Sequence, residues 1–415
     1  MLAKQPDSRS RQEQELNFQS TLGRALLSTK GYSAPEVGET YARARVLAEQ
    51  LGQPGYQLLY GLWVFHLVRG EHELSLSSAE QIVRYGQARN DIAAQLLGRQ
   101  ASATSYFFLG NFFAARSVFE HTGDIRDPVH RSIYKALTPI DPYLVMLGYY
   151  GLTLGYLGDL GGGRSRVNEA LALARQDNHA YALASVLLYA CWMEWIASCP
   201  AEGERFASEL ITLSDANGFP DRLGWALFHR GWSLTALGHA QEGSALIAKG
   251  LSTYRATGAV SGTPWMLTML AGAHWKLGSP TAGLEYLAEA EAIIDKTDER
   301  REEAELHRFR GELVYQLGDK SAGERHYQKA ISIARQQGAK IFELRTATSL
   351  SRLWHDRGDT SEACDLLVPI FKSIQGGSDA CDLKTAQAVL NELRLPRAHV
   401  EQGEQDEQER HSEAR

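Results

Sequence analysis

The chain has 415 residues, a formal net charge of −7, and 22% charged residues. This acidic balance offers no basic stripe or patch for wrapping nucleic acid, so we expect no nucleic-acid partner. No apolar run approaches the roughly 18 residues that span a bilayer, and the N-terminus lacks a signal-type apolar stretch, so we expect no membrane association and a cytoplasmic location.

The N-terminal third is predicted to be helical after a short tail. Residues 1–14 are polar and charged, which is typical of a disordered tail. Alanine, leucine, glutamate, glutamine and arginine fill the periodic segments that follow, without sustained alternation of β-branched residues, which favours helices. Residues 15–120 fit N-terminal hairpins that turn near Gly31, Gly70 and Gly110. Residues 121–142 contain several prolines and are predicted to be an inserted loop.

Residues 143–378 repeat one structural unit every forty residues. The turn positions of successive copies are Gly158, Ser198, Gly238, Gly278, Gly318 and Gly358. A fixed period of this size is the signature of helical repeat arrays, whose units stack because none can bury its own apolar face alone.

Two rows of small residues accompany these turns. Seven residues before each turn lie Gly151, Cys191, Gly231, Ala271, Gly311 and Ser351. Five residues after each turn lie Gly163, Gly203, Gly243, Gly283, Gly323 and Ala363. Small side chains at facing positions let two helices approach closely, since larger ones would hold the backbones apart. The unit is therefore predicted to be a helix, a tight turn and a second helix.

The turn chemistry supports this interpretation. Gly318 stands where a helix would end, and the carboxylate of Asp319 can cap the next helix. Pro280 and Pro200 occupy the first helical position after their turns, where a missing N–H costs nothing. Beyond the repeats, residues 379–396 are predicted to form a capping helix and residues 397–415 a disordered acidic tail.

We predict an all-α fold, namely a tetratricopeptide-like helical-hairpin solenoid with a right-handed superhelix and about nine hairpins. Tetratricopeptide repeats are usually about 34 residues long, so a period of forty implies longer helices. HEAT and armadillo arrays, with periods of about 40 to 47, remain the alternative. The paired rows of small residues around a single turn favour the tetratricopeptide pattern.

The sequence offers no catalytic or metal-binding motif. The run from Gly161 to Gly163 precedes Arg164, but the lysine and the spacing of a phosphate-binding loop are missing, so a flexible turn is the favoured interpretation. No histidine pair has the spacing of zinc ligands, and the four cysteines are scattered. The acidic runs that include Glu299 and Glu302 are expected at helix starts, in water. We therefore expect no catalytic residue, no metal and no cofactor.

The repeat register predicts which side chains face the concave groove, because the first helix of each hairpin lines that groove in tetratricopeptide arrays. The aromatic candidates are Trp192, Trp195, Trp225, Phe228, Trp232, Trp265, Trp275 and Tyr315. The charged continuation includes Arg308, Arg345 and Arg352. Such a stripe suits a peptide, a partner helix or a sugar-like ligand. The alternative, which general packing statistics favour, is that these rings fill the space between neighbouring first helices.

Several segments also resemble the C-terminal region of large bacterial signalling proteins. In that family a class III adenylate or guanylate cyclase domain, or a DNA-binding domain, precedes a predicted ATPase and then tetratricopeptide repeats. The segments are residues 29–37, 61–71, 303–308, 343–354 and 382–384. The resemblance runs from about residue 16 to residue 395 and implies a sensor or docking arm. The positions that would hold the family's catalytic residues are absent from this sequence.

Three functional hypotheses follow. The first is a non-catalytic scaffold or sensor that holds a protein or peptide partner in its concave groove within bacterial signalling, as the regulatory arm of a signalling ATPase or cyclase. The second is a module that senses a small molecule in the groove and regulates a partner. The third is that the chain carries the cyclase or ATPase activity of the longer family.

Overall fold

The computed structural model describes residues 8–30, 35–52, 55–127, 129–130, 133 and 140–394. Within these ranges the chain is helical, and the β-contact is limited to one isolated bridge between Asp159 and Gln375. The N-terminal helices are α1 (Arg9–Lys30), α2 (Pro35–Leu51), α3 (Tyr56–Val68), α4 (His72–Arg89), α5 (Ile92–Phe108), α6 (Phe112–Glu120) and the 3₁₀ helix η2 (Gly123–Arg126).

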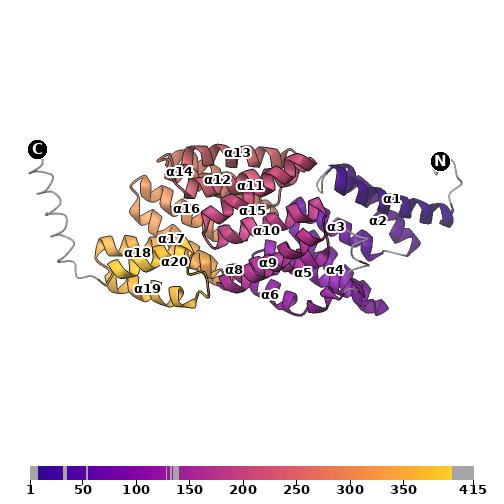
Figure 1. Cartoon of the computed structure of the whole chain (residues 1–415), viewed down its shortest axis with the longest axis horizontal. Helices are drawn as coiled ribbons and strands as arrows, with labels where there is room; N and C mark the ends of the chain where they lie inside the picture. The colour runs from indigo at the N-terminus through magenta and orange to yellow at the C-terminus, as the bar shows by residue number, and fades with distance from the viewer. Residues whose placement is uncertain are drawn as a thin grey trace, which may run out of the picture.

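The forty-residue repeats form pairs of antiparallel neighbours. They are α8 (Pro142–Tyr156) with α9 (Leu160–Gln176), α10 (Ala180–Ile196) with α11 (Pro200–Asn217), α12 (Pro220–Ala236) with α13 (Ala240–Arg255), α14 (Thr263–Lys276) with α15 (Pro280–Thr297), α16 (Glu303–Gln316) with α17 (Lys320–Gln337), and α18 (Lys340–Arg357) with α19 (Thr360–Ser373). The helix α20 (Cys381–Glu392) closes the array. Figure 1 shows the pairs following one another along an elongated body, with α1 at one end and α19 near the other.

The predicted hairpin turns are confirmed wherever the structure describes them. From Gly70 to Gly358, every turn residue of the series has a positive φ, between 52° at Ser198 and 106° at Gly358. This left-handed conformation lets a helix stop and the chain reverse, and glycine adopts it without the steric cost that a Cβ adds. The side chain of Asp319 accepts a hydrogen bond from the N–H of Ala322 at 2.8 Å, as its capping role predicts.

The two rows of small residues meet, as predicted, across the hairpins that begin with α8, α12, α14, α16 and α18, whereas Gly203 of α11 contacts Trp232 and Ser233 of the next hairpin. A Cβ added to Gly231 would lie 2.6 Å from the carbonyl oxygen of Gly243, and one added to Gly243 would lie 2.5 Å from that of Gly231. In the last hairpin the hydroxyl of Ser351 donates to the carbonyl oxygen of Ala363 at 3.2 Å. The sequence signal that defined the repeat is therefore the helix-to-helix contact itself.

Some of the predicted segment boundaries differ from the structure, and others fall outside the described residues. The helix α1 begins at Arg9, so residues 9–14 are helical where we expected a disordered tail. The described part of the expected loop 121–142 contains η2, and Pro142 already belongs to α8. The turn expected at Gly31 and the tail 397–415 lie outside the described residues.

The superhelix closes on itself. The carbonyl oxygen of Val68, at the end of α3, accepts hydrogen bonds from the N–H groups of Val260 and Ser261, both at 3.0 Å. Further along, the N–H of Gln375 donates to the carbonyl oxygen of Gly158 at 2.7 Å. Contacts of this kind join hairpins that are far apart in the sequence, so the interior becomes a packed core that runs from α3 to the residues before α20.

The side chain of Arg164 forms ion pairs that also stabilise this closure. Its guanidinium binds both carboxylate oxygens of Asp379, at 2.8 and 2.9 Å, and also binds Glu194 at 2.6 Å. The glycines that precede it belong to the first turn of α9. Over the ranges that the structure covers, no helix has both the length and the hydropathy needed to cross a membrane.

Candidate functional site

The predicted aromatic stripe points inward, but closure of the superhelix buries most of it. Phe228 and Trp265 are fully buried, and Trp195, Trp192 and Trp225 retain at most 6% exposure. The expectation that these five rings are exposed along an open groove is therefore wrong, because they pack in the interior, as the alternative expects. Trp195 still belongs to the lining of a groove, and Trp192 and Trp225 line an internal cavity.

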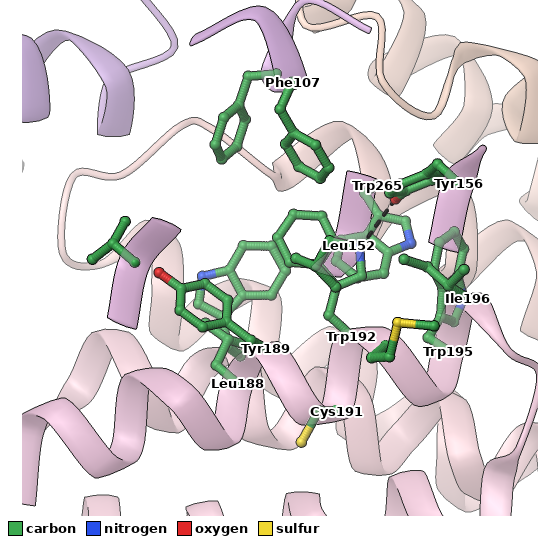
Figure 2. Packing of buried hydrophobic residues seen from close by; sticks show 14 of the residues in the cluster. Phe107, Leu152, Tyr156, Leu188, Tyr189, Cys191, Trp192, Trp195, Ile196 and Trp265 are labelled. Atoms are coloured by element: carbon green, nitrogen blue, oxygen red, sulfur yellow. Dashed lines mark hydrogen bonds between the residues drawn. The ribbon is translucent and has the colours of Figure 1, made fainter. Parts of the chain in front are cut away.

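These rings form the centre of the core. The ring of Trp265 lies 4.8 Å from that of Trp192, 4.6 Å from that of Trp195 and 4.8 Å from that of Phe228, between centroids. Figure 2 shows Trp192 and Trp195 projecting from the same helix toward Trp265, with Tyr156 beside them. Mutual edge-to-face and tilted contacts of this kind stabilise a core beyond the area that the rings bury.

Buried charges lie against the tryptophan core. Arg301, in the linker between α15 and α16, is fully buried, and its guanidinium lies 4.3 Å from the ring centroid of Trp192. It donates to Glu299 at 3.0 Å and to Glu302 at 2.6 Å. His72, from α4, lies 3.4 Å from the other oxygen of Glu299. We call His72, Glu299, Arg301 and Glu302 the central ion cluster.

The cluster continues into the aromatic core through Tyr156. The hydroxyl of Tyr156 lies 2.7 Å from a carboxylate oxygen of Glu302 and accepts a hydrogen bond from the indole N–H of Trp192 at 3.0 Å. The expectation that Glu299 and Glu302 remain in water is wrong, because the linker that carries them folds into the superhelix instead of extending outward.

One arginine cannot neutralise two buried carboxylates equally, and the pKa values reflect this. Burial alone would raise the pKa of Glu299, but the charge of Arg301 and the hydrogen bond with His72 bring it below its usual value. Burial raises the pKa of Glu302 to about 7, against the opposing effect of Arg301. The two carboxylates therefore titrate in different pH ranges.

The remaining predicted residues line a groove of about 570 Å³ in the C-terminal half, which we call the C-terminal groove. Its walls come from α10, α12, α14, α16, α18 and α20, which include the first helix of each hairpin from α10 onward. Trp232, Trp275 and Tyr315 line it and are half-buried, so each presents part of a ring to the groove. Trp195 contributes to its floor.

The charged part of the prediction also lies in the C-terminal groove, where two of the three arginines are already paired. Arg308 binds Glu305 at 2.8 Å. Arg345 binds Asp382 at 2.6 Å and donates to the backbone oxygen of Trp195 at 2.9 Å. The pair of Arg308 with Glu305 lies within α16, whereas Arg345 also approaches Glu305 at 3.6 Å and so links α18 to α10, α16 and α20.

Arg352 differs from its neighbours. It is exposed, lines the C-terminal groove, and has no ion pair or hydrogen bond with any residue that the structure describes. Asp356, one helical turn later on α18, is likewise exposed and unpaired within those residues. The groove thus combines half-exposed aromatic rings with an available guanidinium, which suits a ligand with an apolar part and an acidic group.

The sequence placed the inward-facing register correctly, but it missed the central ion cluster. The burial of Arg301 follows from contacts with α4, α5 and α10, which are distant in the sequence. A clue was present in the linker between α15 and α16, where Glu299, Arg301 and Glu302 bring opposite charges together within four residues.

The hairpins, their left-handed turns and their facing small residues define the molecule as a tetratricopeptide-like helical solenoid. Similar folds occur in a Rap protein complexed with Competence and Sporulation Factor, with a TM-score of 0.57 and 12% identity over 93% of this chain and 100% of that chain. The Rap conjugation gene regulator of plasmid pLS20, in complex with the Phr* peptide, has a TM-score of 0.53 and 11% identity over 86% and 94% of the two chains.

A third similar structure is the apo form of the quorum sensor NprR from B. thuringiensis, with a TM-score of 0.52 and 11% identity over 88% of this chain and 99% of that chain. No family model and no curated protein matches the sequence. At identities this low the likeness establishes the fold alone.

Proposed function

We propose that the chain is a non-catalytic tetratricopeptide-type sensor that binds a short extended peptide, or an extended segment of a protein, in the C-terminal groove. The observation that carries the proposal is the composition of that groove. Trp232, Trp275 and Tyr315 expose ring surface along it, while Arg352 offers an unpaired guanidinium on another wall. Aromatic anchors supply contact area at low entropic cost, and a guanidinium fixes the register of an acidic group.

The preformed geometry of the groove adds to this proposal. The ion pairs of Arg345 with Asp382 and with Glu305 hold α18 against α20 and α16 before any partner arrives. A peptide that enters would therefore not have to order the groove itself, which reduces the cost of binding. The structurally similar pLS20 regulator, whose structure contains the Phr* peptide, supports a peptide as the partner.

The wider role that we propose is the regulatory arm of a bacterial signalling system. It rests on the resemblance of residues 29–37, 61–71, 303–308, 343–354 and 382–384 to the repeat region of cyclase- and ATPase-containing regulators. In this role a bound peptide segment would change how the solenoid contacts a signalling ATPase or cyclase.

Selection from a displayed library of short linear peptides, followed by calorimetry with the enriched peptides, tests the groove. We expect the enriched peptides to combine apolar residues with an acidic group. The double substitution Trp232→Ala and Trp275→Ala should weaken their binding by about tenfold or more, because loss of each aromatic anchor costs on the order of 1–2 kcal/mol. Arg352→Gln should weaken binding and reduce its dependence on salt.

A tryptophan outside the groove provides the matched control. Trp354 lies on α18, is half-buried, and donates its indole N–H to Glu324 at 2.7 Å without lining the groove. The variant Trp354→Ala should bind the selected peptides as the unmodified chain does. Equal affinity in the Trp232 and Trp275 double variant would place the peptide elsewhere and end the proposal.

A further inference from the structure

A second cavity lies away from the C-terminal groove, between the N-terminal hairpins and the middle of the solenoid. Its volume is about 150 Å³, and it is lined mainly by aromatic and aliphatic side chains. The rings come from α2, α3, α5, α8, α10, α12 and α13, and we call this space the aromatic cavity. Trp63, Tyr149, Tyr189, Trp192, Trp225 and Tyr254 supply much of its wall.

The aromatic cavity exists because the superhelix closes. Val68, which lines it from α3, accepts backbone hydrogen bonds from Val260 and Ser261 in the linker between α13 and α14. Residues from both sides of this junction face the same space. A molecule in the cavity would therefore touch the N-terminal hairpins and the central repeats at the same time.

The charges of the cavity favour a neutral occupant. Asp221 and Arg222 both line it, and their side chains pair with each other at 3.4 Å. The guanidinium of Arg301 already lies 4.3 Å from the ring centroid of Trp192 and 4.6 Å from that of Phe108, two rings that line the cavity. A second cation against these rings would meet the repulsion of the first, which removes the usual preference of an aromatic cage for cations.

Ser261, which belongs to the cavity lining, carries a polar atom that lacks a partner among the described residues. The hydroxyl oxygen of Ser261 is buried, and no residue that the structure describes forms a hydrogen bond with it. A buried hydroxyl without a partner costs free energy that a ligand N–H or O–H would recover. The linker that carries Ser261 is held by its backbone, so this residue has a fixed place in the cavity lining.

The size of the cavity limits the ligand further. A cavity of about 150 Å³ with apolar walls is large enough for benzene. We propose that the aromatic cavity binds a neutral, planar aromatic compound of one or two fused rings that carries a single hydrogen-bonding N–H or O–H group. This second site is independent of the peptide groove and would make occupancy by a small molecule stabilise the closed superhelix.

Indole and benzofuran test the proposal, because they share the size and shape of a fused bicycle while only indole has an N–H. We expect saturable binding of both by titration calorimetry, tighter binding of indole, and a rise of the melting temperature with indole concentration. Ser261→Ala should weaken the binding of indole by about 2- to 10-fold, which corresponds to the loss of one hydrogen bond. The affinity for benzofuran should stay unchanged.

Substitutions that fill the cavity provide a second test of the proposal. Val64 lines it from α3, whereas Val46 lies on α2, is 44% exposed and does not line it. Val64→Phe should abolish binding of both probes, and Val46→Phe should leave it intact, with circular dichroism confirming the fold of each variant. The Trp232 and Trp275 double variant should bind indole normally. Absence of saturable indole binding, or binding that survives Val64→Phe, would overturn the proposal.

Discussion

Ser198 occupies a turn position that glycine holds in the other described turns of the series, and it does so with a φ of 52°. A residue with a Cβ in this left-handed region carries a steric cost of roughly 1 kcal/mol relative to glycine. The cost is tolerated because the flanking helices and the backbone hydrogen bond from the N–H of Cys381 to the carbonyl oxygen of Ser198, at 3.2 Å, hold the turn in place.

Replacing Ser198 with glycine should therefore stabilise the chain by about 1 kcal/mol, seen as a higher denaturation midpoint in urea. Gly238 provides the reciprocal test, because its φ is 97° and no atom lies within 4 Å of an added Cβ. Gly238→Ser should lower the midpoint by a similar amount. A midpoint that does not move in either variant would show that these turns relax without strain.

The residues of the candidate site also show what a repeat register can predict. The repeat register predicted which side chains point inward, and Trp232, Trp275, Tyr315 and Arg352 do line a groove. The register carried no information about how exposed each side chain is. Trp265 is buried because Arg301 and residues from other hairpins pack against it, and none of these contacts is encoded within one repeat.

At the scale of the element, the hairpin is set by the approach of its two helices. The hairpin of α12 and α13 contains two such close approaches, Gly231 against Gly243 and Gly224 against Gly250. The contacting glycines belong to the same forty-residue repeat. The hairpin turns and helix pairs could therefore be predicted from the sequence pattern of a single repeat. The short linkers between hairpins carry no comparable signal, and one of them supplies three of the four residues of the central ion cluster, Glu299, Arg301 and Glu302.

The substitution Gly231→Ala should destabilise the chain by about 1–3 kcal/mol, because its Cβ would collide with a backbone oxygen that cannot move independently. The matched control is Gly161→Ala in α9, where the nearest atom to an added Cβ is 3.9 Å away. Alanine there should leave stability unchanged or raise it slightly, since alanine favours helices more than glycine does. Thermal unfolding followed by circular dichroism compares the two variants directly.

At the scale of the whole molecule, the central ion cluster makes stability depend on pH. Burial raises the pKa of Glu302 from 4.5 to about 7, so between these values the folded chain holds a proton that the unfolded chain releases. The contribution of the Glu302 carboxyl to the free energy of unfolding is fully present below pH 4.5 and is lost as the pH rises through 7. Glu299, whose pKa is lowered, has the opposite dependence and loses its contribution in acid.

The variant Glu302→Gln isolates the first effect, because glutamine cannot ionise. At pH 5 its free energy of unfolding should be close to that of the unmodified chain. At pH 8 its free energy of unfolding should be higher by on the order of 2 kcal/mol. Urea denaturation at the two pH values gives both differences. A variant that is equally destabilised at pH 5 and pH 8 would show that Arg301 keeps Glu302 ionised throughout.

The junction of Val68 with Val260 and Ser261 changes how the solenoid loses its structure. In an open array each repeat touches only its neighbours, so the ends can peel away while the middle persists. Here the early hairpins rest on later ones, and removing either partner exposes the tryptophan core to water. We therefore expect the hairpins that share this core to unfold together in one transition, although the sequence consists of modular repeats.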